Sequence, residues 1–126
     1  MQEDASGLYF DFNKSFLENY EIKESEIQIQ VRDFAILGGY PGIELYTRYP
    51  KCILVYKNVS HSKRTVAEYL DTTRQQFGKR YEIIDSNFTP TDEMSYMHFL
   101  DLVSEELNAY ISWEIIASAV EVKELE

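Results

Sequence analysis

The chain has 126 residues, of which 44% are hydrophobic and 14% aromatic. We therefore expect residues 1 to 126 to form a single globular domain that folds without a disulfide or a metal ion. The net charge of −10 opposes the basic footprint of a nucleic-acid-binding protein and disfavours that partner class. Cys52 is the only cysteine, and neither a signal peptide nor a membrane-length apolar run occurs, so a cytoplasmic protein outside the membrane is expected.

Alternating apolar residues predict two strands in the first third of the chain. One covers residues 8 to 12 and the other residues 26 to 37, which show the pattern of a half-buried strand. Between them, residues 16 to 20 carry apolar side chains at helical spacing but form too short a segment to assign. After Asp33 the apolar positions change parity, and a β-bulge or a second short strand would restore an inward face for both sets.

The segment Gly-Gly-Tyr-Pro-Gly at residues 38 to 42 is typical of a chain reversal. Alternation over residues 43 to 48 then predicts a partly exposed strand, and the apolar run at residues 52 to 56 predicts a central strand buried on both faces. Pro50 either separates these strands or lies at a sheet edge or bulge, because it has no N–H to donate.

Two amphipathic helices are expected in the second half of the chain. The first follows a capping-box pattern of Thr65 with Glu68 and ends before Gly78. Thr89 would cap the second helix, with Pro90 at its first position. The apolar stripe of the second helix would consist of Met94, Met97, Leu100, Val103, Leu107 and Tyr110.

A strand at residues 81 to 85 separates the two expected helices. Alternation over residues 111 to 117 predicts a last strand, and residues 118 to 124 fit either a strand or a helix. The expected fold is therefore α+β, with a mainly antiparallel twisted sheet of about five to six strands and two amphipathic helices packed on one face.

Charge is distributed unevenly along the chain. Residues 1 to 47 carry nine acids and three cations, residues 48 to 80 carry two acids and eight cations, and residues 81 to 126 carry eleven acids and one cation. Such asymmetry either forms separate acidic and basic surfaces that steer a charged partner, or is neutralised inside the fold where the basic segment packs beside its acidic flanks.

The acidic and tyrosine-rich segments supply the candidate partner-binding residues. On the expected second helix, Asp101, Glu105 and Glu106 would form an acidic face for a protein with a basic surface, although a solvated helix face is the ordinary explanation. Tyrosine gives contact area at low entropic cost, so the hairpin that opens the basic segment is the second candidate. Its candidate residues are Tyr40, Tyr46, Arg48 and Tyr49.

A weaker pattern indicates an anion site at the start of the expected first helix. There, Ser62, Lys63 and Arg64 could receive a phosphate or a carboxylate together with backbone N–H groups. A solvated helix cap explains the same residues, since no glycine-rich phosphate loop accompanies them.

No catalytic or metal-binding motif occurs in the chain. The two histidines and one cysteine lack zinc-ligand spacing, and Cys52 lies in an apolar run where a nucleophile would be inaccessible. We therefore expect no cofactor and a non-enzymatic, acidic protein-binding module, of the type of an inhibitor or immunity protein that neutralises a basic toxin or nuclease. The alternatives are a module for a small anion or nucleotide, or an assembly subunit, that uses residues 48 to 80, and an enzyme of unspecified activity.

Overall fold

The computed structural model describes residues 10–12, 15–36, 47–86, 88–89 and 94–125, which form strands and no helix. The strands are β1 (Phe10–Asp11), β2 (Phe16–Ile22), β3 (Glu26–Ile36), β4 (Thr47–Lys57), β5 (His61–Tyr69), β6 (Phe77–Ile84), β7 (Tyr96–Ser104), β8 (Ala109–Ala117) and β9 (Ala119–Glu124).

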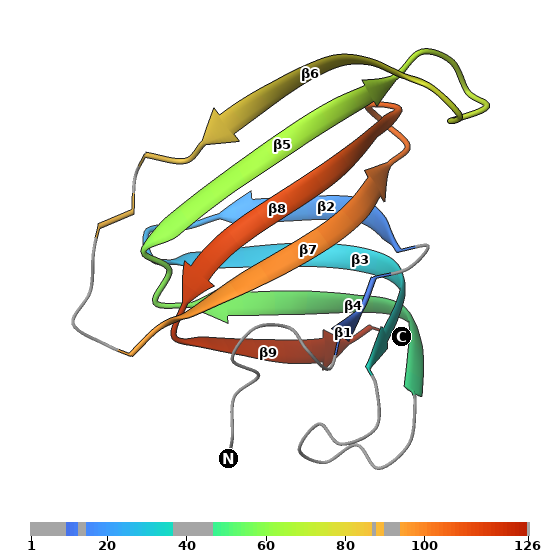
Figure 1. Ribbon diagram of the computed structural model, residues 1–126. Coiled ribbons are helices and arrows are strands. Elements are labelled where there is room, and N and C mark those ends of the chain that lie inside the picture. The colour runs from blue at the N-terminus through green and yellow to red at the C-terminus, as the bar shows by residue number, and fades with distance from the viewer. Residues whose placement is uncertain (1–9, 13–14, 37–46, 87, 90–93, 126) are drawn as a thin grey trace.

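Eight of these strands follow one path, β6-β5-β8-β7-β2-β3-β4-β9, and the short β1 pairs with β3. Neighbouring strands are antiparallel except β2 and β7, which share a parallel bridge between Phe16 and Val103. The path folds at this bridge into two halves, β6-β5-β8-β7 and β2-β3-β4-β9. Figure 1 shows the two halves as layers whose strands cross at an angle.

A second connection between the layers is a corner in the paired strands. The chain passes from β4 to β5 through Asn58, which has a left-handed φ of 54°, and from β8 to β9 through Ser118. Asn58 Nδ2 donates to Ser118 Oγ at 2.8 Å, and the Ser118 N–H donates to the Lys57 carbonyl at 3.0 Å. The pairing of β5 with β8 therefore continues around the corner as the pairing of β4 with β9.

The hydrophobic core lies between the two layers. Alternate residues of β3, β4, β7 and β8 point into it, as the period of a strand requires. The largest fully buried side chains include Trp113, Tyr56, Phe34, Ile27, Ile29, Leu54, Leu100, Leu102 and Ile115.

The expected α+β fold is wrong, because the first expected helix is instead β5, a loop and the start of β6. Thr65, Val66 and Tyr69 are β-branched or aromatic residues that favour a strand. The loop after them turns at Asp71, whose carboxylate accepts the Thr73 N–H at 2.9 Å, and at Arg74, which has a φ of 58°. Apolar residues at helical spacing thus lie on two paired strands.

The second expected helix is also wrong, since residues 96–104 form β7. His98, Leu100, Leu102 and Ser104 are buried, whereas Phe99 and Asp101 between them are exposed. The buried residues alternate with a period of two, but the first and last of them, His98 and Ser104, are polar. The apolar residues alone therefore fitted the spacing of a helix. The expected capping residue Pro90 lies outside the described residues.

Several strand predictions are confirmed, at residues 26–36, 81–84 and 111–117. The change of face after Asp33 comes from a left-handed backbone there, with a φ of 59°. Pro50 lies within β4, beyond the point where β9 begins to pair at Cys52, and therefore at a sheet edge. The sequence did not decide between a helix and a strand at residues 16–20 and 118–124. In the structure, the first segment lies in strand β2 and the second contains strand β9. The expected reversal at residues 38–42 lies outside the described residues.

Candidate functional site

A buried ion pair lies on the inner face of the β6-β5-β8-β7 layer. Arg64 of β5, which is 8% exposed, donates from Nη2 to Asp85 Oδ1 at 2.8 Å and from Nη1 to Tyr20 Oη at 2.8 Å. Its guanidinium also lies over the rings of Tyr20 and Trp113, at 5.0 and 5.1 Å from their centroids. The guanidinium is therefore held by contacts from three other strands or loops.

A second pair of hydrogen bonds completes the polar network around Asp85. The Ser62 hydroxyl donates to Asp85 Oδ2 at 2.6 Å, and Trp113 Nε1 donates to Ser62 Oγ at 2.8 Å. Both carboxylate oxygens of Asp85 therefore accept a hydrogen bond. The negative charge of Asp85 compensates the positive charge of Arg64 within the fold.

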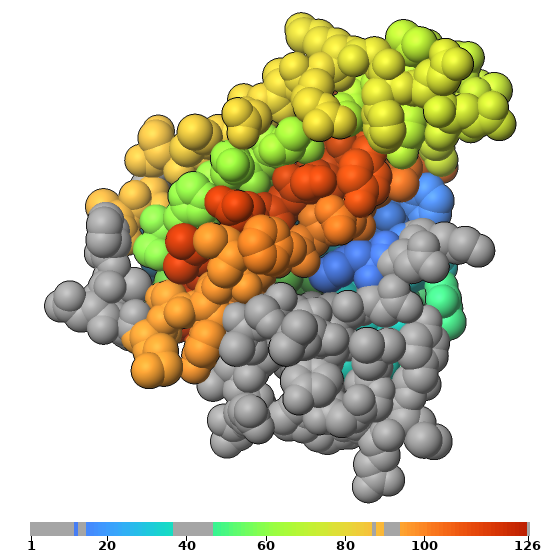
Figure 2. All heavy atoms as spheres, in the orientation of Figure 1, coloured from blue at the N-terminus to red at the C-terminus, as the bar shows by residue number. Residues whose placement is uncertain are grey.

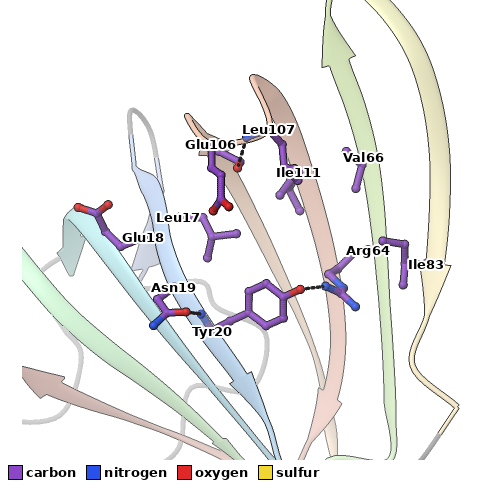
Figure 3. A pocket seen from close by; sticks show the side chains of 11 residues that line it. Leu17, Glu18, Asn19, Tyr20, Arg64, Val66, Ile83, Glu106, Leu107 and Ile111 are labelled. Atoms are coloured by element: carbon purple, nitrogen blue, oxygen red, sulfur yellow. Dashed lines mark hydrogen bonds between the residues drawn. The ribbon is translucent and has the colours of Figure 1, made fainter.

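A cleft of about 210 Å³ opens beside this network. It lies between β2 on one side and β5, β6 and β8 on the other, with the β7–β8 turn at one end (Figure 3). The volume is below the roughly 300–1,000 Å³ of sites for drug-sized ligands and matches a side chain or a small molecule. The apolar lining residues are Leu17, Val66, Ile83, Leu107 and Ile111.

Two acids line the cleft: Glu18, which lies 3.4 Å from Arg32 Nη1, and Glu106. The carboxylate of Glu106 is the one that faces the cleft without such a pair. It comes from the β7–β8 turn and is directed into the cleft toward Leu17 (Figure 3). Among the described residues, no cation lies within ion-pair distance of Glu106. The adjacent Glu105 differs, because Arg32 Nη2 lies 2.7 Å and Arg74 Nη2 3.9 Å from its carboxylate oxygens.

A hydrogen-bond donor remains at the cleft. Arg64 is one of the lining residues, and its Nε is buried without a hydrogen-bond partner in the part of the chain that the structure describes. An unpaired buried donor is costly, so an acceptor oxygen in the cleft would be favoured there.

The three residues of the expected anion site do not share one surface. Ser62 and Arg64 point inward to Asp85, whereas Lys63 points outward and lies 3.5 Å from Glu82. The cause is the alternation of faces along a strand, which replaces the expected helix start.

The expected acidic face is likewise divided. Asp101 lies on the outer face of β7, where it accepts a hydrogen bond from Ser112 Oγ at 3.2 Å. Burial, helped by the negative charge of Asp101, raises the pKa of Tyr110 to about 12. Glu105 and Glu106 lie in the turn that follows β7, and only Glu106 enters the cleft.

The aromatic part of the expected partner surface is only partly described. Tyr49 is half-buried against Phe34, with ring centroids 6.4 Å apart, and burial raises the pKa of its hydroxyl. Arg48 is exposed on β4. Tyr40 and Tyr46 lie outside the described residues.

Four cations of the basic segment pair with acids of the acidic C-terminal segment. The pairs are Lys57–Glu121, Lys63–Glu82, Arg64–Asp85 and Arg74–Glu105. Much of the charge asymmetry along the sequence is thus neutralised in three dimensions.

The sequence predictions missed Asp85 and Tyr20, which hold Arg64. Asp85 lies 21 residues and Tyr20 44 residues from Arg64 in the chain. No local pattern signals either contact, because both depend on the register and crossing of strands. Glu106 was identified as a candidate, but on a helix rather than at a cleft.

The described residues contain no group of three His, Cys, Asp or Glu side chains arranged to hold a metal ion. They also contain no helix long and apolar enough to cross a membrane. Comparisons of the chain with protein-family models, curated proteins and solved structures find no match.

Proposed function

We propose that this chain is a non-enzymatic, acidic protein-binding module whose cleft receives a cationic side chain of a basic partner protein. The observation that supports this most directly is the Glu106 carboxylate, which is directed into a largely apolar cleft and has no cation of the described chain within ion-pair distance. Lysine and arginine bury an aliphatic stem along apolar surface while the charged end stays at a polar edge. Leu17, Val66 and Ile111 match the stem, and Glu106 matches the charge.

The charge of the whole chain supports the same class of partner. A net charge of −10 attracts a basic protein over distances of about a Debye length and repels acidic ones. An inhibitor or immunity-type protein that neutralises a basic toxin or nuclease is the example we favour. A cytoplasmic location is part of this proposal, because Cys52 is a free, buried thiol.

A small neutral ligand is the second candidate function. The unpartnered Nε of Arg64 would donate to a carbonyl or hydroxyl oxygen of such a ligand. An anion is less favoured in the same place, because Asp85 already compensates Arg64 and Glu106 shares the cleft.

Three probes with six carbon atoms each separate these occupants: hexylammonium, hexanol and hexanoate. We expect NMR titration of the methyl groups of Leu17, Val66 and Ile111 to show the tightest binding for hexylammonium and the weakest for hexanoate. The advantage of hexylammonium over hexanol should shrink as salt is added, because it is electrostatic. The methyl groups of Val120, which lies in the core and does not line the cleft, serve as the control.

The ranking of the probes decides between the candidates. Tightest binding of hexanol would favour the neutral ligand, and tightest binding of hexanoate would revive the anion alternative. Either result, or no probe-induced shift at the three cleft residues, contradicts the proposed preference for a cationic side chain.

A further inference from the structure

Strand β6 is an edge of the sheet that carries exposed apolar side chains at its two ends and exposed Lys79, Arg80 and Glu82 between them. It pairs with β5 on one side, and no described strand lies on its other side (Figure 1). Ile84 is 64%, Phe77 50% and Leu70, just before the strand, 62% exposed. In Figure 2 the side chains of this segment form the upper rim of the molecule. An exposed edge of this kind is a template for pairing with another strand.

The hydrogen-bonding direction of β6 follows from its pairing with β5. The Asp85 N–H donates to the Ser62 carbonyl at 3.0 Å, and the register places Ile83 opposite Arg64 and Tyr81 opposite Val66. Because bonding direction alternates along a regular antiparallel strand, residues 81, 83 and 85 bond toward β5. The N–H and C=O groups of residues 80, 82 and 84 therefore point to the free edge, whereas the pairing shifts register between Arg80 and Phe77.

We propose that β6 pairs antiparallel with β6 of a second copy of this chain, about a twofold axis at Tyr81. A twofold antiparallel pair places one residue opposite itself and keeps facing residues on the same side of the sheet. With the axis at Tyr81, the residue opposite Arg80 is Glu82 of the second copy. The outward N–H and C=O groups of residues 80 and 82 then bond to each other across the interface.

Charge complementarity selects this register. Among the described residues, no acid lies within ion-pair distance of Arg80, and the Glu82 side chain is 59% exposed beside Lys63. Because of the twofold symmetry, the contact between Arg80 of one copy and Glu82 of the other occurs twice in the dimer. Moving the axis to Arg80 would instead place two guanidinium groups opposite each other, which is destabilising.

The apolar side chains fit the same register. A Cβ added at Gly78 would lie 2.8 Å from Leu70 Cδ2, so Leu70 already covers this glycine. Ile84 of the second copy would lie at the same end of the strand pair as Leu70 and cover it in turn. The other edge strand, β9, is shorter and carries exposed Glu121, Lys123 and Glu124 with none of the exposed large apolar side chains of β6.

A pair of charge-reversal variants tests the register. We expect wild-type protein to form a concentration-dependent dimer in sedimentation velocity, and Arg80→Glu and Glu82→Arg alone to be folded monomers by circular dichroism and sedimentation. Each variant alone would oppose like charges. An equal mixture of the two opposes unlike charges at both positions, so it should form a heterodimer.

A disulfide trap tests the axis. Tyr81 would face its own copy at a non-hydrogen-bonded position, where the Cα atoms are about 4.5 Å apart and within disulfide range. Tyr81→Cys should therefore oxidise to a linked dimer. Lys79→Cys, on the same face, should not, because Ile83 of the second copy would lie opposite it.

Three results would overturn the inference. They are a wild-type monomer at every concentration, no heterodimer on mixing the charge-reversal variants, and open-ended assembly, which would indicate pairing of β6 with β9. The inference is independent of the cleft, since the charge-reversal variants change no residue that lines it.

Discussion

Lys63 and Arg64 are adjacent in the chain, yet their charges lie in different environments. Lys63 meets Glu82 at the surface, where the side chains are 32% and 59% exposed. Arg64 meets Asp85 where the side chains are 10% and 12% exposed. Solvent screens the first pair, whereas removal of one partner from the second leaves a buried charge without compensation.

The two pairs should therefore respond very differently to truncation. We expect Asp85→Ala to lower the free energy of unfolding by about 3–5 kcal/mol, measured by urea denaturation. Glu82→Ala, which removes the acid of the exposed pair, is the matched control and should cost less than about 1 kcal/mol. Equal losses would show that Arg64 is not held by a buried ion pair.

The one thiol of the chain should be inert in the folded state. Cys52 is fully buried, and burial raises its pKa from 9.0 to about 12. This shift alone lowers the thiolate fraction at neutral pH about 1,000-fold. We expect alkylation of native protein to be slower than alkylation in urea by at least that factor. Comparable rates would place the thiol at the surface.

The same shift gives a pH dependence of stability. The folded pKa is raised above that of the free thiol, so its stabilising contribution is complete below about pH 9. It is lost as the pH rises toward about 12. Cys52→Ala should show a shallower alkaline loss of stability than wild type in urea denaturation, and an unchanged slope would contradict the assignment.

The residue types in the sequence did not show which groups they contact. Ser62 and Arg64 were predicted to receive a phosphate or a carboxylate together with Lys63, and in the structure both bind the carboxylate of Asp85 of the same chain. Glu105 and Glu106 look equivalent in sequence. Only the fold shows that Arg32 neutralises the first and that the second enters the cleft.

At the scale of elements, the sequence correctly predicted the strands in which every second residue is apolar and faces the core. Ile27, Ile29 and Val31 of β3 and Trp113 and Ile115 of β8 are of this kind. The inward set of β7 begins and ends with a polar residue, and β5 buries Ser62 and Arg64, so neither alternates cleanly in hydrophobicity. Helical spacing was the stronger local signal there, and tertiary burial overrode it.

The corner at Asn58 joins the two layers and should be sensitive to substitution. Asn58→Ala strains the left-handed backbone and removes the hydrogen bond to Ser118, at about 1 kcal/mol each, for an expected loss of about 2 kcal/mol. Asn58→Gly keeps the backbone conformation, so we expect a loss of about 1 kcal/mol. Urea denaturation measures both, and equal losses would show that backbone conformation is not the cause.

At the scale of the whole molecule, folding neutralises much of the basic segment and leaves a carboxylate in the cleft. The ion pairs between residues 48 to 80 and 81 to 126 account for Lys57, Lys63, Arg64 and Arg74. The sequence indicated both separate patches and neutralisation, and pairing between distant strands could not be read from it. Under the proposed function, partner choice would depend on the remaining acids, and Glu106 is directed into the cleft.

The most direct test compares the affinity for hexylammonium of two variants with the same change in net charge, Glu106→Gln and Glu105→Gln. We expect Glu106→Gln to weaken binding about two- to fivefold, the range of an exposed ion pair. Glu105→Gln should leave binding nearly unchanged, because Arg32 already holds that carboxylate. Equal weakening by both would mean that the cleft responds only to net charge, and unchanged binding in Glu106→Gln would contradict the proposed role of the cleft.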